Sequence, residues 1–437
     1  MTENQIIHSF DATFSVEGEL FITEKYRDLY FAMSERPFIS RGAGVSYPLA
    51  SAGVGVRSIV SLQFNRILEF NNETGVVKAE SGLSVGELLK FLSQRGWWLP
   101  AIPGHPSITL GGCVAANVHG KSQYHSGLFA DSVLEMELFH PRHGKILCLP
   151  KSLPFQLTAG GFGLTGHILS VSIQCKPLTG KSLVRTSLPC ANIFECIELM
   201  QNEKDQYQQV YSWNDLNQKG EKFGAGYVYY EKFGAEAVPD IQEFNVLYSP
   251  PRSSLMDQVF AWTLKNRISQ AYSMKESFAP KSQSLGILAG AFPINGKEIY
   301  HRLFGKNGLL ESQIIIPHAE LKPVIEKLSL AIAEFGGAVS LGSLKIFRGQ
   351  QNYINFLTDG ICLALNVPNS ARALDLFRKI DEICEDHHCL SNIAKDSRLT
   401  QDVVAATYEG YQQFKKDIFD FDPSKTVSSA LRVRLGL

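Results

Sequence analysis

The sequence predicts an α+β protein with an early, strand-rich region and a later antiparallel sheet that carries helices on one face. Three observations predict this fold class. Short strands dominate up to Pro177, and strands interleaved with long amphipathic helices come after it. Glycine-rich turns occur three times before residue 167. A strand, a proline and a helix follow one another twice, at Pro317 and at Pro368, which is typical of a duplicated βα unit.

The elements of the first region are short and clearly bounded. Ser84 and Glu87 form a capping box that predicts a helix over Val85 to Arg95, closed by Gly96. The alternation of apolar and polar residues from Leu169 to Lys176 predicts a half-buried strand. The other expected elements are strands at Phe38–Ile39 and Val76 to Glu80 and a hairpin made by Glu135 to Phe139, a turn at 141–144, and Lys145 to Leu149.

The second region repeats one unit. Ile314 to Ile316 leads into a helix over Leu321 to Phe335, and Leu363 to Val367 leads into a helix over Ser370 to Glu385. The last segment is polar, is predicted to be helical around Thr400 to Phe414, and contains the run AKDSR at 394–398. We expect boundaries at 1–178, 179–389 and 390–437.

Composition excludes several classes of protein. Among 437 residues, 42 Lys and Arg balance 43 Asp and Glu, so no strong field gathers nucleic acid. The eight scattered cysteines favour reduced, buried thiols and a reducing compartment. The sequence shows no leader and no long apolar run, so we expect a cytoplasmic protein. Met256 to Tyr272 is predicted to be an amphipathic helix packed on its own domain, with contact to a membrane surface as the alternative.

The three glycine-rich segments predict a phosphate-bearing cofactor. They are Arg41 to Tyr47, Pro103 to Lys121 and Ala159 to Gly166. Glycine lets a main chain approach a ligand closely, and the amides of Gly104, Gly111, Gly112 and Gly120 are expected to face anionic oxygens. Neither a Rossmann turn nor a Walker loop fits, because Tyr47 stands where a third Rossmann glycine belongs and no Walker sequence occurs.

These segments, with AKDSR at 394–398, resemble the vanillyl-alcohol-oxidase/para-cresol-methylhydroxylase (VAO/PCMH) type of FAD-binding proteins, and within it the oxidase half of a bacterial sugar epimerase of cell-envelope synthesis. The resemblance implies a two-lobed FAD-binding domain over 1–178, a substrate domain over 179–389, and a segment 390–437 that returns to the FAD-binding domain. Val45 and Pro106 stand where relatives bond to the flavin through histidine or cysteine, which implies non-covalent FAD.

The same resemblance assigns residues to the FAD. Arg41 to Tyr47 are expected around the pyrophosphate, Gly104 to Gly112 and Asn117 to His119 along the flavin, and Gly160 to Ile168 beside the adenine half. The individual residues implied are Arg41, Gly42, Ala43, Gly44, Val45, Ser46, Tyr47, Gly104, His105, Ser107, Thr109, Gly111, Gly112, Ala115, Ala116, Asn117, His119, Gly161, Gly163, Gly166 and Ile168.

The resemblance also implies a set of catalytic residues at the flavin ring: Lys395, Tyr47, His119, Lys345, Gln313, Cys362 and Lys121. A carbinol loses its hydride only as its hydroxyl proton departs, and Lys395 and Tyr47 are the candidates for contact with that oxygen. Lys345 or Lys121 is expected to pair with a substrate phosphate. For His119 both steering of the substrate and bracing of the flavin loop stay open, whereas a packed thiol is favoured for Cys362.

The sequence departs from the family's pattern on the substrate side. Glu311 replaces an expected glutamine, Gly360 replaces an asparagine, and the segment before Tyr300 differs. Trp213 keeps an aromatic wall. The cluster Cys384 to Cys389 has no second ligand pair, so we expect a helix end and no metal.

The function implied is FAD-dependent oxidation of a secondary hydroxyl to a ketone, on a phosphorylated or polyprenyl-phosphate-linked sugar. A short-chain reductase would complete the epimerisation, and a peripheral position at the inner face of the membrane would suit a lipid-linked substrate. Two alternatives stay open: an aldonolactone or 2-hydroxyacid oxidase on the same fold, and a flavin-binding partner subunit without turnover.

Overall fold

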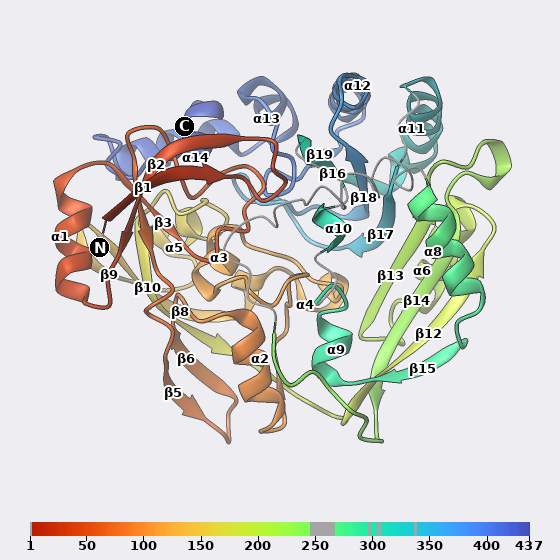
Figure 1. Ribbon diagram of the computed structural model, residues 1–437, viewed down its shortest axis with the longest axis horizontal. Coiled ribbons are helices and arrows are strands. Elements are labelled where there is room, and N and C mark those ends of the chain that lie inside the picture. The colour runs from red at the N-terminus through yellow and green to blue at the C-terminus, as the bar shows by residue number, and fades with distance from the viewer. Residues whose placement is uncertain (1, 245–266, 296–298, 303, 305–306, 336–338) are drawn as a thin grey trace.

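The computed structural model describes residues 2–244, 267–295, 299–302, 304, 307–335 and 339–437 (Figure 1). Its strands form four sheets, with the two larger N-terminal sheets on the left of Figure 1 and an eight-stranded sheet on the right. The predicted α+β class is confirmed.

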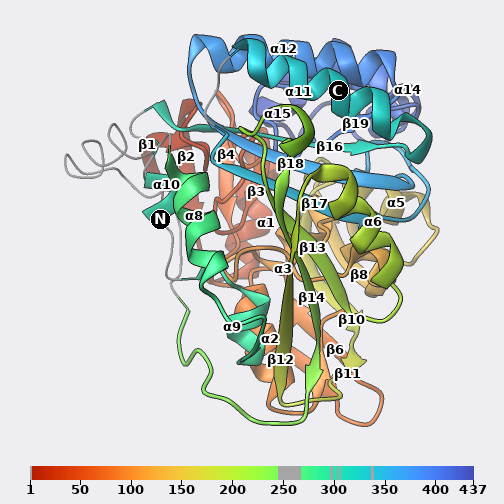
Figure 2. The ribbon, with the colours of Figure 1, turned by 90° about the vertical axis from the view of Figure 1, so that its right-hand side faces the viewer.

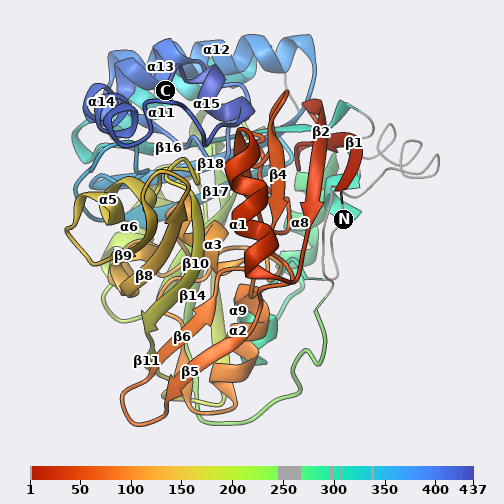
Figure 3. The same ribbon diagram turned by 90° about the vertical axis from the view of Figure 1, so that its left-hand side faces the viewer.

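The first sheet has four strands in the order β1-β2-β4-β3. Its β1 and β2 are antiparallel, whereas β4 pairs in parallel with both β2 and β3. Helix α1 lies along this sheet (Figure 3) and buries Leu29, Ala32 and Met33. The bounds are β1 (Thr2–His8), β2 (Ser15–Ile22), α1 (Tyr26–Glu35), β3 (Phe38–Arg41) and β4 (Arg57–Val60).

The second sheet has five antiparallel strands in the order β5-β6-β10-β8-β9. They are β5 (Ile67–Asn71), β6 (Val76–Glu80), β8 (Val133–His140), β9 (Gly144–Cys148) and β10 (His167–Gln174). Strand β6 and the β8–β9 hairpin confirm the predictions. The expectation of a half-buried β10 is wrong, because this strand lies at the centre of the sheet, where Ser170 and Ser172 are buried along with the apolar residues.

Short helices lie in the connections between the strands of this second sheet. In α2, Ser84 accepts a hydrogen bond from the Glu87 N–H at 3.2 Å, which confirms the predicted N-cap, and the helix ends at Ser93, two residues earlier than predicted. The bounds are α2 (Val85–Ser93), α3 (Leu110–Ala115), α4 (Gln123–Ser126), a 3₁₀ turn at Phe129–Ser132, and α5 (Leu153–Thr158), while β7 (Trp97–Trp98) pairs with β11 (Lys176–Pro177).

The eight-stranded sheet is antiparallel throughout, in the order β15-β12-β14-β13-β17-β18-β16-β19. Its strands are β12 (Ser182–Cys190), β13 (Gln209–Asp215), β14 (Ala225–Gly234), β15 (Ser282–Leu285), β16 (Leu309–Ile316), β17 (Leu341–Phe347), β18 (Gly360–Pro368) and β19 (Leu390–Ser391). Its helices are α6 (Ile193–Glu203), α8 (Ile268–Ser277), α9 (Ile287–Ala291), α10 (Ile299–Arg302), α11 (Leu321–Phe335) and α12 (Ala371–Asp386), with 3₁₀ turns at Gly220–Lys222 and His318–Glu320. Both predicted βα units are confirmed.

The two faces of this sheet differ in chemistry. On one face Ile314, Leu344 and Leu363 pack in a core shared with α6, α11 and α12, and the last two helices lie side by side in Figure 2. Residues opposite each other in a ladder share a face, and so do residues two apart along a strand. The register pairs Tyr211 with Lys345 and Lys345 with Cys362. The other face, here called the polar face, therefore carries Arg185, Tyr211, Glu231, Glu311, Gln313, Lys345 and Cys362.

The C-terminal segment contains three helices, α13 (Gln401–Thr407), α14 (Tyr411–Phe421) and α15 (Ala430–Arg434). A single helix around Thr400 to Phe414 was the wrong expectation. The chain leaves the helix at Tyr408, whose buried hydroxyl donates to the Ser391 carbonyl at 2.6 Å. At Gly410 a side chain would collide with the backbone of Tyr353, so tertiary packing decides the break.

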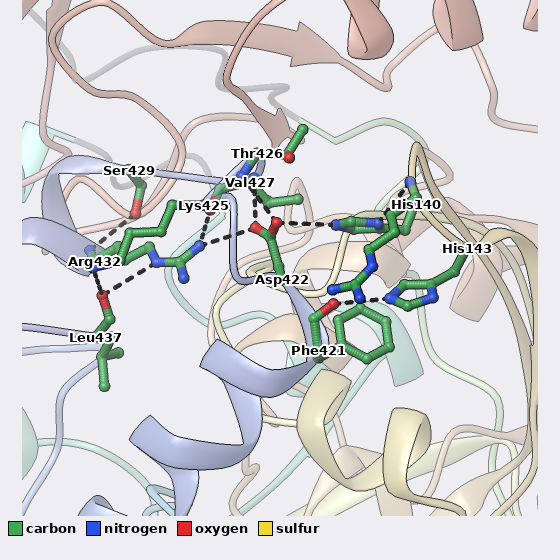
Figure 4. Close-up of polar contacts among 11 residues, drawn as sticks. His140, His143, Phe421, Asp422, Lys425, Thr426, Val427, Ser429, Arg432 and Leu437 are labelled. Atoms are coloured by element: carbon green, nitrogen blue, oxygen red, sulfur yellow. Dashed lines mark hydrogen bonds and ion pairs between the residues drawn. The ribbon is translucent and has the colours of Figure 1, made fainter.

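A buried charge cluster attaches this segment to the second sheet (Figure 4). The Asp422 carboxylate accepts hydrogen bonds from the Val427 N–H at 2.9 Å and from Arg432 Nη1 at 3.2 Å. His140 Nε2, on β8, lies 3.7 Å from the same carboxylate. Burial alone would raise the pKa of Asp422, but hydrogen bonding by His140 and by backbone N–H groups holds this pKa below its usual value.

The predicted amphipathic helix at Met256 to Tyr272 lies outside the described residues except for its last six, of which Ile268 to Tyr272 begin α8. Among the helices that the structure describes, none has the length and apolar character needed to cross a bilayer.

Candidate active site

All three glycine-rich segments line one cleft, together with Ala394 and Lys395. Its space, including the solvent at the mouth, is about 1090 Å³. The predicted residues that line it are Gly42, Ala43, Gly44, Val45, Ser46, Tyr47, Thr109, Gly111, Gly112, Ala115, Ala116, Gly163, Gly166 and Ile168. Ile108, Val118, Phe162 and His167 also line it and lie within the segments expected along the cofactor. Residues that the sequence reasoning missed are Ser40, Pro48, Ala50, Ser51, Ser61, Ser81 and Ala394, several of which directly flank the motifs.

The loop after β3 leaves a row of backbone donors free. Within the described part of the chain, no N–H from Gly42 to Tyr47 donates a hydrogen bond to another protein group. These residues line the cleft, and Gly44 takes a left-handed φ of +73°. Successive free amides in such a turn form a concavity that binds anionic oxygens. This loop therefore fits a pyrophosphate.

A buried cation lies behind the same loop. Arg41 is 7% exposed and donates to Ser51 Oγ at 2.8 Å, and no carboxylate among the described residues pairs with it. Burial lowers its pKa to about 10, so the guanidinium stays charged at neutral pH. A buried charge without a counterion is costly, and an anionic group in the cleft would offset that cost. The donor set therefore fits FAD by its chemistry.

The second glycine segment works differently from the expectation. The Gly111 N–H donates to the Ser81 carbonyl at 2.8 Å and the Gly112 N–H to Thr109 Oγ1 at 3.3 Å, so neither amide is free for a ligand. A side chain at Gly42 would collide with Thr109. Glycine here allows two loops to pack closely. Gly120 likewise packs against the backbone of Ile102, and Gly104 is exposed.

Several residues assigned to the cofactor do not line the cleft. Asn117 is used structurally, since its amide donates to Asn355 Oδ1 at 2.9 Å and its carbonyl accepts from the Ala130 N–H at 3.0 Å. His105 Nδ1 accepts from the Ser107 N–H at 3.2 Å. Gly161 packs against the Leu157 carbonyl.

His119 lies between aromatic rings, 4.9 Å from Phe347 and 5.8 Å from Phe356 by ring centroids. Burial, followed by the charges of Lys345 and Lys395, lowers its pKa well below the usual value, so the imidazole is neutral. His119, Lys345 and Lys395, which come from three distant segments of the chain, are therefore close enough to interact electrostatically.

Two further predicted residues, Lys345 and Cys362, are neighbours on the polar face. Burial lowers the pKa of Lys345, and burial raises the pKa of Cys362 to about 12, which leaves an unreactive thiol. Gln313 follows on β16, where its side-chain carbonyl accepts from Asn392 Nδ2 at 2.7 Å. The Asn392 carbonyl in turn accepts from the Lys395 N–H at 3.1 Å, so Asn392 joins Gln313 to the loop that carries Lys395.

The Lys395 ammonium lies between an aromatic ring and a carboxylate. Its Nζ is 4.6 Å from the centroid of Tyr47 and 3.5 Å from Glu311 Oε1. Burial, with added effects of Glu311 and Asp11, raises the pKa of Tyr47 well above its usual value, so the phenol keeps its proton.

Lys121 belongs to a separate cluster. Its Nζ donates to the Gly290 carbonyl at 2.9 Å and lies 3.5 Å from Glu231 Oε2. Glu231 is fully buried and also pairs with Arg185 at 2.7 Å. Burial lowers the pKa of Lys121 to about 8. The structure therefore places Lys345 and Lys395 near each other. Lys121 lies beside them but pairs with Glu231, a carboxylate that the sequence did not indicate.

The aromatic wall and the cysteine cluster are also located. Trp213 is buried on the polar face, 4.8 Å from the ring of Tyr272. Helix α12 ends at Asp386, beside the buried thiols Cys384 and Cys389. In the described ranges no group of three or more His, Cys, Asp or Glu side chains is placed to hold a metal ion.

Comparison with known proteins agrees with this geometry. Residues 30–149 match the family described as FAD binding domain. The chain is 25% identical to decaprenylphosphoryl-β-D-ribose oxidase of Mycolicibacterium smegmatis over 92% of this chain and 90% of that protein. It is 28% identical to D-lactate dehydrogenase of Anaerostipes hadrus over 37% and 35% of the two chains. Cholesterol oxidase from B. sterolicum has the same fold, with a TM-score of 0.72 at 13% identity over 100% of this chain and 97% of that one.

Proposed function

We propose that this chain, an FAD-dependent oxidoreductase of the PCMH/VAO-type fold that acts on CH–OH groups, has a phosphorylated or polyprenyl-phosphate-linked sugar as its substrate. One secondary hydroxyl of that sugar becomes a ketone. A short-chain reductase would then restore the opposite configuration, which makes the chain the oxidase half of a two-protein epimerase. The relative that is a decaprenylphosphoryl-β-D-ribose oxidase supports this substrate class.

The observation that carries the proposal is the unpaired ammonium of Lys345. Among the described residues it has no hydrogen-bond or ion-pair partner, although it is coupled electrostatically to Lys395. Lys121, the other candidate for a substrate phosphate, is held by Glu231 and Gly290. A half-buried cation without a partner favours an anionic ligand, and a phosphate beside the reacting sugar carbon supplies one.

The residues have distinct roles in this proposal. Bound FAD supplies the hydride acceptor. The free amides of 42–47, with the Arg41 charge behind them, hold the pyrophosphate. Lys395 and Tyr47 donate hydrogen bonds to the reacting oxygen, and Lys345 binds the phosphate. Non-covalent FAD is part of the proposal, because Val45 and Pro106 have no nucleophilic atom.

The proposal also assigns regions of the chain. Residues 1–178 bind FAD, 179–389 bind substrate, and 390–437 return Lys395 to the FAD-binding region, supported by the packing of Asp422 near His140. Work on a polyprenyl carrier would place the protein in the cytoplasm at the inner face of the membrane.

A 2-hydroxyacid is the second candidate substrate, because its carboxylate would suit the Lys345 ammonium and the chain partly matches a D-lactate dehydrogenase. The test is anaerobic mixing of the yellow protein with polyprenyl-phosphate sugars, sugar phosphates and 2-hydroxyacids while flavin absorbance is followed. Bleaching by a phosphorylated sugar is expected, and bleaching by 2-hydroxyacids alone would refute the proposal.

Two variants and one treatment sharpen this test. Lys345→Met should raise KM for the phosphorylated sugar by about 10- to 100-fold, since a charge-assisted contact contributes about 1.5–3 kcal/mol. Lys222→Met, which changes an exposed lysine, should leave KM unchanged. Acid precipitation should leave the yellow colour in the supernatant, and a coloured pellet would contradict non-covalent FAD.

A further inference from the structure

Oxidation of an alcohol needs a proton acceptor as well as a hydride acceptor. Lys395 and Tyr47, the groups proposed to meet the reacting oxygen, do not serve as acceptors. An ammonium has no lone pair, and the raised pKa of Tyr47 keeps its phenol protonated. Lys345 fails for the first reason, and Cys362 is a neutral, buried thiol. Glu311 and His119 are the two candidate proton acceptors that remain near Lys395.

Glu311 is placed to receive a proton through Lys395. Its residue is 8% exposed, on the polar face of β16, and Oε1 lies 3.5 Å from Lys395 Nζ. The other oxygen, Oε2, accepts from Asn366 Nδ2 at 3.1 Å, and Asn366 is itself 2% exposed. One oxygen is thus fixed by a buried amide while the other faces the lysine. The neutral amide of Asn366 orients the Glu311 carboxylate toward Lys395 and leaves its negative charge in place.

His119 has a different setting. Its ring packs against Phe347 and Phe356, and within the described residues no hydrogen bond joins it to Tyr47 or Lys395. A proton bound there would also be repelled by Lys345 and Lys395, the two cations that act on its pKa. Protonation of Glu311 gives a neutral acid, whereas protonation of His119 would add a third positive charge beside Lys345 and Lys395.

We propose that Glu311 is the positioning residue that finally accepts the substrate's hydroxyl proton, relayed through Lys395. This inference rests on the proposed function. As the C–H hydrogen leaves with its electron pair to the flavin, the C–O bond becomes a carbonyl. Lys395 Nζ gives one of its protons to Glu311 Oε1, and the lone pair that this frees on the nitrogen takes the hydroxyl proton. Lys395 ends as it began, and the carboxylate becomes a neutral acid. The glutamine expected from the family's pattern at this position has no such capacity.

The test compares Glu311→Gln with Glu326→Gln, a control that changes an exposed carboxylate on α11. Both holoproteins should keep the wild-type flavin spectrum. With a sugar that bleaches the wild-type enzyme, Glu311→Gln should slow flavin reduction by about 100- to 10,000-fold, the usual range for loss of a proton-transfer group, with little change in KM. The control should match wild type. Added formate should partly restore the rate of Glu311→Ala, because it replaces the missing carboxylate.

A second readout does not depend on rates. Infrared difference spectra of the wild-type enzyme, taken on reduction by substrate, should show the carbonyl band of a newly protonated carboxylic acid, and Glu311→Asp should retain such a band at a shifted position. Wild-type rates in Glu311→Gln, absence of this band in the wild-type enzyme, or its loss only in His119→Gln would each overturn the inference. If no sugar bleaches the wild-type enzyme, the proposed function itself fails.

Discussion

Gly44→Ala tests whether the loop after β3 holds the cofactor. Gly44 has a φ of +73°, where an alanine costs about 1–2 kcal/mol, and the new Cβ would lie 2.7 Å from Arg41 Cζ. The free loop relaxes to relieve this strain, but bound FAD requires the original shape, so the strain appears as lost affinity. A cost of about 1–2 kcal/mol corresponds to about 5- to 30-fold weaker FAD binding. Displacement of the Arg41 guanidinium would add to this loss.

Gly55→Ala is the matched control. Gly55 has nearly the same φ, +71°, and its Cβ would meet nothing within 4 Å. Gly55→Ala should therefore lower the free energy of unfolding in urea without changing the affinity for FAD, whereas Gly44→Ala should lose affinity in titrations of the apoprotein with FAD followed by flavin fluorescence. Wild-type affinity in Gly44→Ala, or equal losses in the two variants, would refute the assignment of this loop to the pyrophosphate.

Two further predictions concern stability. Burial lowers the pKa of His167 from 6.5 to about 4, so between these pH values the unfolded chain binds a proton that the folded chain does not. The free energy of unfolding should fall by about 3 kcal/mol as pH drops through this window, and His167→Gln should reduce that fall; an unchanged pH dependence would refute it. Asp422→Asn should cost about 3–5 kcal/mol in urea unfolding because Arg432 is left buried without its partner, whereas the exposed Asp420→Asn should cost little; similar losses would count against the cluster.

Local patterns in the sequence predict much of the fold. Strand β6 and helix α11 have the predicted bounds, because hydrophobic spacing and a preceding proline act within a few residues. The break between α13 and α14 was missed because it depends on Gly410 meeting Tyr353, more than fifty residues away. Position within a sheet likewise decided the burial of β10, which alternation alone does not reveal.

The candidate site divides in the same way. The glycine segments indicated the cleft, since close backbone approach leaves a mark in the sequence. No local pattern in the sequence indicated the partners of the lysines. Glu231 pairs with Lys121 and Glu311 pairs with Lys395, and the two residues of each pair are far apart in the sequence. Reading alternate positions on β14 and β16 would have placed both glutamates on the polar face, but their pairing depends on the register.

The eight-stranded sheet has one polar face and one face packed against helices, and this difference affects how substrate specificity can change among related proteins. Odd positions of β16 lie on the polar face, whereas even positions pack against the helix layer, so Glu311 can differ from its counterpart in relatives without disturbing the hydrophobic core. A new substrate specificity can therefore arise from a few substitutions at alternate positions of the polar face, while the glycine-rich loops of the cleft stay unchanged.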